Sequence, residues 1–159
     1  MMMKIALAGL ILLVGCTREN ARVTTTLNNG AALVGDLPSN PMQDKVITSW
    51  VDKQGSTMST MFGNDVAMRY ARTNQGTQYP AGSVVSVVTW SQNEDPRWFG
   101  GNIPANAKSV EFVSVGPGAN AYSYQRYEGS PLKKVIGEDG VAPNERATSL
   151  LSQRAAVMP

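Results

Sequence analysis

Residues 83–90 read Ser83-Val84-Val85-Ser86-Val87-Val88-Thr89-Trp90 and have the clearest strand pattern in the sequence. The valines and the threonine are β-branched, and with the terminal tryptophan they favour a strand over a helix. The residues just before this stretch, Gln78 to Gly82, include the proline and the glycine of a turn. We therefore expect residues 83–90 to form a strand that lies centrally in a β-sheet.

Two more strands are predicted downstream of this one, on either side of a turn at residues 116–120. The first, residues 108–115, places Val110, Phe112 and Ser114 on one face and Glu111, Val113 and Val115 on the other. The second, residues 121–129, places Tyr122, Tyr124 and Arg126 on one face. Because a short turn joins them, the two strands are expected to pair as an antiparallel hairpin.

The residues upstream of the central strand predict helix, strand and helix. The spacing of Val46, Ile47, Trp50 and Val51 predicts a helix over residues 42–53, with Asp36 or Ser39 as its cap. Residues 56–62 alternate like a short strand. The turn 63–65 then offers an N-cap for a helix over residues 66–74.

A polar loop is expected at residues 91–107, and the C-terminal part of the chain predicts one more helix. Asn144 is the expected cap of a helix over residues 145–157. The apolar stripe of that helix would pack on the sheet and consists of Ala147, Leu150, Leu151 and Ala155. The pattern as a whole indicates an α+β fold, mainly an antiparallel β-sheet with packed short helices.

The N-terminus has the pattern of a secretory signal. Lys4 precedes an apolar run from Ile5 to Val14, and Gly15 and Cys16 follow. The run is too short to span a bilayer of about 30 Å as a helix. We expect residues 1–15 to be a signal peptide, residues 16–41 a flexible tether in which Leu27 to Leu37 docks on the domain, and residues 42–159 the folded domain.

The end of the signal, Leu13-Val14-Gly15-Cys16, resembles the lipobox of bacterial lipoproteins. The resemblance implies cleavage before Cys16 and lipid attachment to its thiol, which would anchor the chain stably in a membrane. Thr17 follows the cysteine, and in this class of lipoprotein a residue other than Asp at that place implies the outer membrane, with the domain facing the periplasm or the cell surface. The alternative is a free thiol at the end of an ordinary signal peptide.

Composition excludes much familiar chemistry. The 159 residues include one cysteine and no histidine, which rules out an internal disulfide, Cys-based zinc sites and the catalytic triads that use His. The net charge of +2 and the absence of a basic stripe argue against nucleic-acid binding. No pair of carboxylates is singled out by its spacing for acid–base catalysis, so no catalytic residue is predicted.

The order of several short motifs resembles the cytochrome P-460 family. These motifs are Gly63-Asn64-Asp65-Val66-Ala67, Tyr79-Pro80-Ala81-Gly82, Val88-Thr89-Trp90, Asp95-Pro96-Arg97-Trp98, Val110-Glu111-Phe112 and Tyr122-Ser123-Tyr124. The resemblance spans residues 50–127 and implies a mostly β periplasmic domain with haem attached through a C-x-x-C-H motif. The segment after Gly140, where that motif would stand, has neither Cys nor His. The resemblance thus implies the fold and the compartment, but no cofactor.

Three groups of residues are candidates for a site, each with an alternative. Trp90, Trp98, Phe112, Tyr122 and Tyr124 line a pocket in the space where family members hold haem, or pack the sheet. Met58, Met61 and Met68 bind Cu(I), or fill the core. The pairs Asp95 with Arg97 and Glu111 with Arg126 are polar site groups, or surface ion pairs.

Three classes of function follow from these readings. The first is a membrane-anchored envelope lipoprotein whose haem-less domain binds a small apolar ligand or an envelope protein without catalysis. The second is a periplasmic oxidoreductase or electron-transfer protein that holds haem non-covalently. The third is a structural lipoprotein whose chemistry is limited to its anchor.

Overall fold

A computed structural model describes residues 27–73, 78–118, 121–136 and 142–156. These residues form a six-stranded antiparallel sheet in which each strand pairs with the next along the chain. The strands are β1 (Lys45–Asp52), β2 (Thr57–Gly63), β3 (Val84–Glu94), β4 (Asn102–Val115), β5 (Tyr122–Glu128) and β6 (Lys133–Lys134). The helices are α1 (Asp65–Thr73) and α2 (Pro143–Leu151), with single 3-10 turns η1 (Asn29–Ala31) and η2 (Pro41–Gln43). The predicted α+β class is confirmed.

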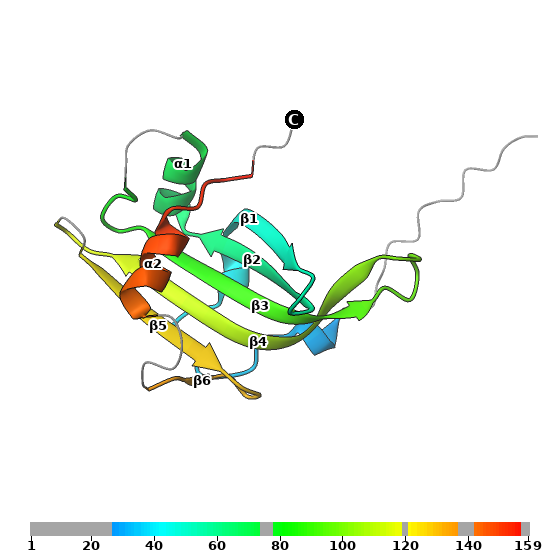
Figure 1. Ribbon diagram of the computed structural model, residues 1–159. Coiled ribbons are helices and arrows are strands. Elements are labelled where there is room, and N and C mark those ends of the chain that lie inside the picture. The colour runs from blue at the N-terminus through cyan, green and yellow to red at the C-terminus, as the bar shows by residue number, and fades with distance from the viewer. Residues whose placement is uncertain (1–26, 74–77, 119–120, 137–141, 157–159) are drawn as a thin grey trace, which may run out of the picture.

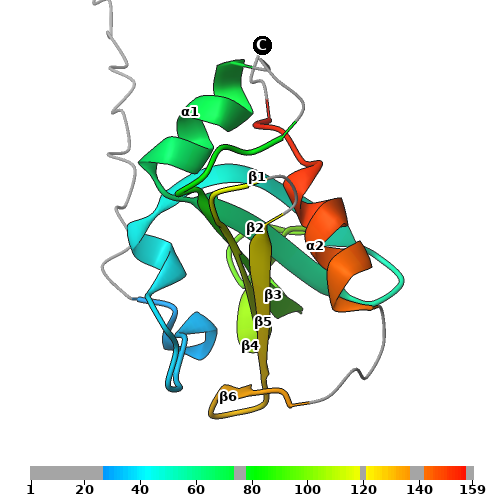
Figure 2. The same ribbon diagram turned by 90° about the vertical axis from the view of Figure 1, so that its left-hand side faces the viewer.

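The sheet is covered on both sides (Figures 1 and 2). Helices α1 and α2 lie on one side, which we call the helix face, and the segment 27–41 crosses the other, which we call the N-terminal face. Alternate residues of β3 supply both cores, because Val85 and Val87 point to the helix face while Val88 and Trp90 point to the N-terminal face. The prediction of a central strand is confirmed.

Strands β3 and β4 are longer than the sequence predicted. They continue to pair beyond Trp90, as far as Glu94 opposite Asn102, so much of the expected loop 91–107 is a two-stranded ribbon. The ribbon was missed because its side chains are mostly polar. Backbone pairing in an antiparallel ribbon does not require the apolar pattern from which strands are recognised.

The predicted helix over residues 42–53 is wrong, because the chain forms strand β1 there. A break in the register between Val46 and Thr48 explains the error. An irregularity of this kind disturbs the alternation of side chains, so the apolar residues fall at spacings that imitate a helix. Several of these residues are β-branched, and β-branched side chains favour a strand over a helix, which agrees with the structure.

Both predicted helices form, with two corrections. The helix predicted over residues 145–157 spans Pro143–Leu151 instead, so Ala155 packs on the core from the segment after α2, and residue 157 lies outside the described residues. The Oδ1 atom of Asn64 accepts a hydrogen bond from the backbone N–H of Ala67 at 3.0 Å, as an N-cap of α1 does. Asn144 is not the cap of α2, because that helix begins at Pro143, whose ring already favours the first turn. Leu150 of α2 is buried against the sheet, as the apolar stripe predicted.

Part of the segment expected as a tether packs on the domain. Ala31, Leu33 and Leu37 contact the core of the N-terminal face. The indole Nε1 of Trp90 donates a hydrogen bond of 2.9 Å to the carbonyl of Ala31. A single tryptophan thus fills the core and holds the covering segment in place.

The replacement Trp90→Ala is expected to lower the free energy of unfolding by about 3–5 kcal/mol, since it opens a cavity and frees a carbonyl. Trp98→Ala is the matched control, because Trp98 is 74% exposed, and it should change stability by less than about 0.5 kcal/mol. Denaturant unfolding of both variants measures the difference. Equal stabilities would show that the indole of Trp90 does not support this core.

Candidate functional site

The structure divides the five residues predicted to line one pocket. Trp90 and Phe112 are buried in the core of the N-terminal face. Tyr122 and Tyr124 pack on the opposite side, against the helix-face core. Trp98 lies in the turn between β3 and β4, largely exposed. The alternation of side chains along β3, β4 and β5 separates these groups, so the five do not share a pocket.

The three candidate copper ligands are also separated. Met58 and Met61 occupy β2 three positions apart, which puts them on opposite faces of the sheet. Met61 and Met68 are buried in the helix-face core, so their thioethers pack against carbon. No group of three or more carboxylate or thiol side chains that could hold a metal occurs within the described ranges.

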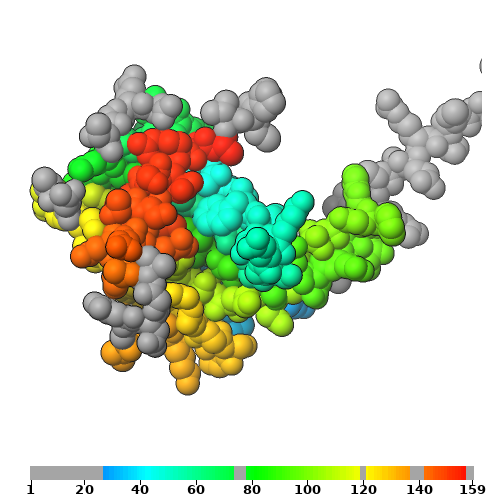
Figure 3. Space-filling model, viewed as in Figure 1, coloured from blue at the N-terminus to red at the C-terminus, as the bar shows by residue number. Residues whose placement is uncertain are grey.

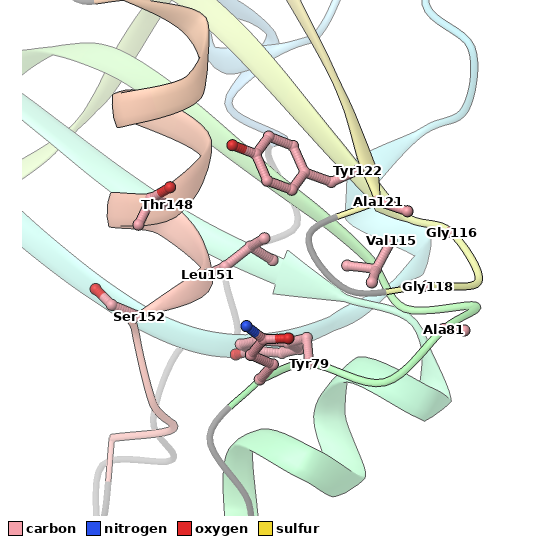
Figure 4. A pocket seen from close by; sticks show the side chains of 11 residues that line it. Tyr79, Ala81, Val115, Gly116, Gly118, Ala121, Tyr122, Thr148, Leu151 and Ser152 are labelled. Carbon is pink, nitrogen blue, oxygen red and sulfur yellow. The ribbon is translucent and has the colours of Figure 1, made fainter.

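A cavity of about 290 Å³ lies on the helix face, between α2 and the turn that joins β4 to β5 (Figure 4). Thr148, Leu151 and Ser152 line it from α2 and the residue after that helix. Val115 and Tyr122 line it from the sheet, and Tyr79 from the loop before β3. Figure 4 shows the side chain of Leu151 extending from α2 toward Val115 and Tyr122. Tyr122 is the one residue of the predicted pocket that lines this cavity.

The lining combines an apolar surface with a few hydroxyl groups. Leu151 and Val115 supply aliphatic carbon, while the hydroxyls of Thr148 and Ser152 can donate and accept. The Tyr79 hydroxyl donates to the carbonyl of Gln153 at 3.0 Å. Burial raises the pKa of Tyr79 to about 12, so its ring remains uncharged at neutral pH. The cavity therefore suits a small, neutral, mainly apolar molecule with a hydrogen-bonding group.

A buried polar cluster lies on the same face as the cavity. Arg146 of α2 clasps the carboxylate of Glu111 in β4 with two hydrogen bonds, Nε to Oε1 at 2.8 Å and Nη2 to Oε2 at 2.7 Å. The hydroxyl of Tyr124 in β5 donates to Oε1 of Glu111 at 2.5 Å. These three contacts join α2 to two strands, so they set the position of one cavity wall.

The charge state of this cluster follows from its contacts. Burial alone would raise the pKa of Glu111, but hydrogen bonds from Arg146 and Tyr124 and the nearby guanidinium charges hold it below its usual value. Burial and the hydrogen bond to Glu111 raise the pKa of Tyr124. Glu111 is thus ionised and Tyr124 protonated at neutral pH. Because Glu111 is fully engaged by its partners, its role here is to position α2.

The interpretation of Glu111 with Arg126 as a surface ion pair is wrong. Glu111 is only 4% exposed, and its partner is Arg146. Arg126 does lie directly opposite Glu111 in the sheet, but its guanidinium pairs with Glu128. A charged residue between Val110 and Phe112 was the signal for a buried pair, although the sequence does not reveal which distant arginine supplies the partner. Asp95, in the other expected pair, accepts a hydrogen bond from the backbone N–H of Arg97 at 2.8 Å.

Haem, which the resembled family carries, does not fit the residues of this cavity. The residues that line it include no thiol, imidazole, thioether or amine, which are the usual axial ligands of haem iron. A tyrosine can ligate iron as a tyrosinate, but the raised pKa of Tyr79 opposes its ionisation. The Tyr122 hydroxyl is directed to the carbonyl of Asn144 at 3.4 Å. The described residues of this cavity therefore offer no axial ligand for haem iron.

No family model matches the chain, and no curated protein matches it. Neither helix in the described part of the chain has the length and apolar character needed to cross a membrane. Function is therefore inferred from the residues and their geometry.

Glu111→Gln is expected to lower the free energy of unfolding by about 2–4 kcal/mol, because it leaves the guanidinium of Arg146 without its counter-charge. The pKa of Glu111 is lower in the folded chain, so its stabilising effect is complete above the ordinary value of 4.5 and is lost as the pH falls below it. Unfolding measured from about pH 7 to pH 3 should therefore show a weaker pH dependence in the variant. The double variant Glu111→Leu with Arg146→Met should be less destabilised than Glu111→Gln. A double variant that is as unstable as Glu111→Gln would contradict the ion-pair account.

Proposed function

We propose that this protein is a membrane-anchored envelope lipoprotein whose haem-less, cytochrome P-460-like domain binds a small, neutral, mainly apolar ligand without catalysis. The observation that carries the binding role is the cavity between α2 and the β4–β5 turn, with its aliphatic lining, two tyrosine rings and hydroxyl rim. Its volume of about 290 Å³ is close to the lower end of known ligand pockets. A molecule about the size of two fused aromatic rings is a suitable occupant.

The anchoring half of the proposal rests on the sequence. An apolar run from Ile5 to Val14, typical of a secretory signal, ends in Gly15 and Cys16, which resemble the end of the lipobox of bacterial lipoproteins. Several acyl chains on one thiol give stable attachment, since each buried methylene contributes about 0.8 kcal/mol. Thr17 after the cysteine favours the outer membrane, so the domain stands in the periplasm or at the cell surface.

The cavity favours a binding role over a purely structural one. A domain whose chemistry is limited to its anchor has no need of a hollow in a covered sheet, because close packing is the more stable arrangement. The hydroxyl groups of Thr148 and Ser152 would select for a ligand with a polar group at one end. The residues that line this cavity oppose haem binding at this place, which favours the non-catalytic proposal for it.

Cys16→Ser is expected to abolish lipid attachment, because the sequence contains a single cysteine and a hydroxyl does not replace the thiol in this reaction. The variant should remain as an uncleaved precursor or leave the outer-membrane fraction. Fractionation of the envelope and the mass of the mature chain measure both effects. A variant with unchanged mass and unchanged location would refute the anchor.

Thr148→Trp is expected to fill the cavity and prevent binding. A suitable probe is 2-naphthol, a neutral two-ring compound with one hydroxyl. A bound ligand stabilises the folded state, so saturating probe should raise the melting temperature of the wild-type chain in detergent by about 2–4 °C. The variant should show no rise. Ser149→Trp is the matched control, because the next residue of α2 points about 100° away and is not among those that line the cavity. An equal rise in all three chains, or none in the wild type, would contradict the proposed site.

A further inference from the structure

The ribbon formed by the ends of β3 and β4 carries the most exposed aromatic side chains of the described residues. Strand β2 pairs with β3 as far as Ser91, and β5 pairs with β4 as far as Ser109. The β3–β4 pair continues alone to its turn and projects from the body of the domain (Figures 1 and 3). In that turn Trp98 is 74% and Phe99 105% exposed. Two adjacent aromatics at the end of a projecting ribbon make an exposed apolar tip.

The turn is held in a defined conformation. The carboxylate of Asp95 accepts the N–H of Arg97 at 2.8 Å, and the N–H of Gly101 donates to the carbonyl of Trp98 at 2.9 Å. The N–H of Asp95 closes the turn on the carbonyl of Gly101, also at 2.9 Å. These contacts present both aromatic side chains outward instead of against the sheet.

The chain enters the domain at the base of this ribbon. The side-chain amide of Asn28 donates to the carbonyl of Pro104 in β4 at 2.6 Å, and η1 follows directly against β4. Residues 17–26 separate Cys16 from Leu27, and a fully extended stretch of that length reaches at most about 40 Å. A lipid on Cys16 therefore keeps the membrane surface within that distance of the ribbon.

We propose that Trp98 and Phe99 insert into the headgroup region of the bilayer that holds the Cys16 lipid, and so form a second membrane contact that orients the domain. This inference rests on the proposed lipid anchor. Tryptophan favours the membrane interface, where an apolar ring and a polar N–H are both satisfied. Glu94 and Asp95 together outweigh the positive charge of Arg97 beside the aromatics, so anionic lipid would not strengthen the contact.

Insertion of Trp98 and Phe99 would also determine the direction in which the cavity faces relative to the bilayer. Strand β4 begins at the ribbon and ends at Val115, which lines the cavity. A strand of 14 residues extends for roughly 45 Å. With the ribbon in the bilayer, the cavity faces the aqueous compartment, and its ligand arrives through water.

The test uses the mature lipidated chain in phosphatidylcholine vesicles, some of which contain brominated acyl chains that quench nearby indoles. The chain has three tryptophans, so the signal of Trp98 is the difference between the wild type and Trp98→Phe. We expect brominated lipid to reduce the Trp98 emission at least about twofold and the bilayer to protect it from acrylamide. Val51→Ser, which removes another exposed apolar side chain, is the matched control and should leave the Trp98 signal unchanged.

The outcomes separate this inference from the anchor. A chain that floats with the vesicles while Trp98 stays open to acrylamide and untouched by brominated lipid overturns the insertion and leaves the anchor standing. Protection of Trp98 without lipid, rising with protein concentration, assigns the tip to a second copy of the chain and also overturns it. If Cys16 carries no lipid, the anchor of the proposed function fails, and the second contact with the same bilayer is overturned with it.

Discussion

Burial of β3 on both of its faces requires the other elements of the domain to cover the sheet from two sides. Val87 points to one side of the sheet and Val88 to the other, and both are fully buried. An antiparallel sheet often leaves one face in water, but here each face needs a cover. The helices cover one face and the segment 27–41 covers the other. The N-terminal part of the domain thus contributes to the core through Ala31, Leu33 and Leu37.

The cover on the helix face is held by a polar interaction as well as by apolar contact. Glu111 lies in the middle of a strand between buried residues, and removing its charge from water is costly. Two hydrogen bonds from Arg146 and one from Tyr124 offset that cost. Apolar packing of Leu150 would allow α2 to slide on the sheet, whereas a bidentate pair fixes both its height and its rotation. The cavity exists because α2 is fixed at this place.

The sequence predicted most strands and the helices correctly, because the local patterns there agree with the final packing. Strands form within residues 83–90, 108–115 and 121–129, and the cap of α1, Asn64, lies in the turn where a cap was expected. β1 was mistaken for a helix, since the irregularity near Ile47 breaks its alternation. The residues of the pocket were predicted incorrectly, because Trp90 lies on the N-terminal face of the sheet and Tyr122 lies on the helix face. The partner of Glu111 is 35 residues away along the chain, and no local pattern identifies such a contact.

The long β3–β4 pair connects the ribbon with the exposed aromatic tip to the end of the domain that contains the cavity. At one end the ribbon and the entry of the chain at Asn28 lie together, and at the other end Val115 lines the cavity. In the proposed arrangement, this stiff pair of strands would transmit orientation from the membrane to the cavity without a conformational change, since the hydrogen-bonded ladder between β3 and β4 is the longest in the described part of the sheet. A lipid on Cys16 alone would let the domain rotate freely about its linker. The two proposed contacts would define an axis, and a domain held along that axis would keep the cavity at a constant distance from the bilayer.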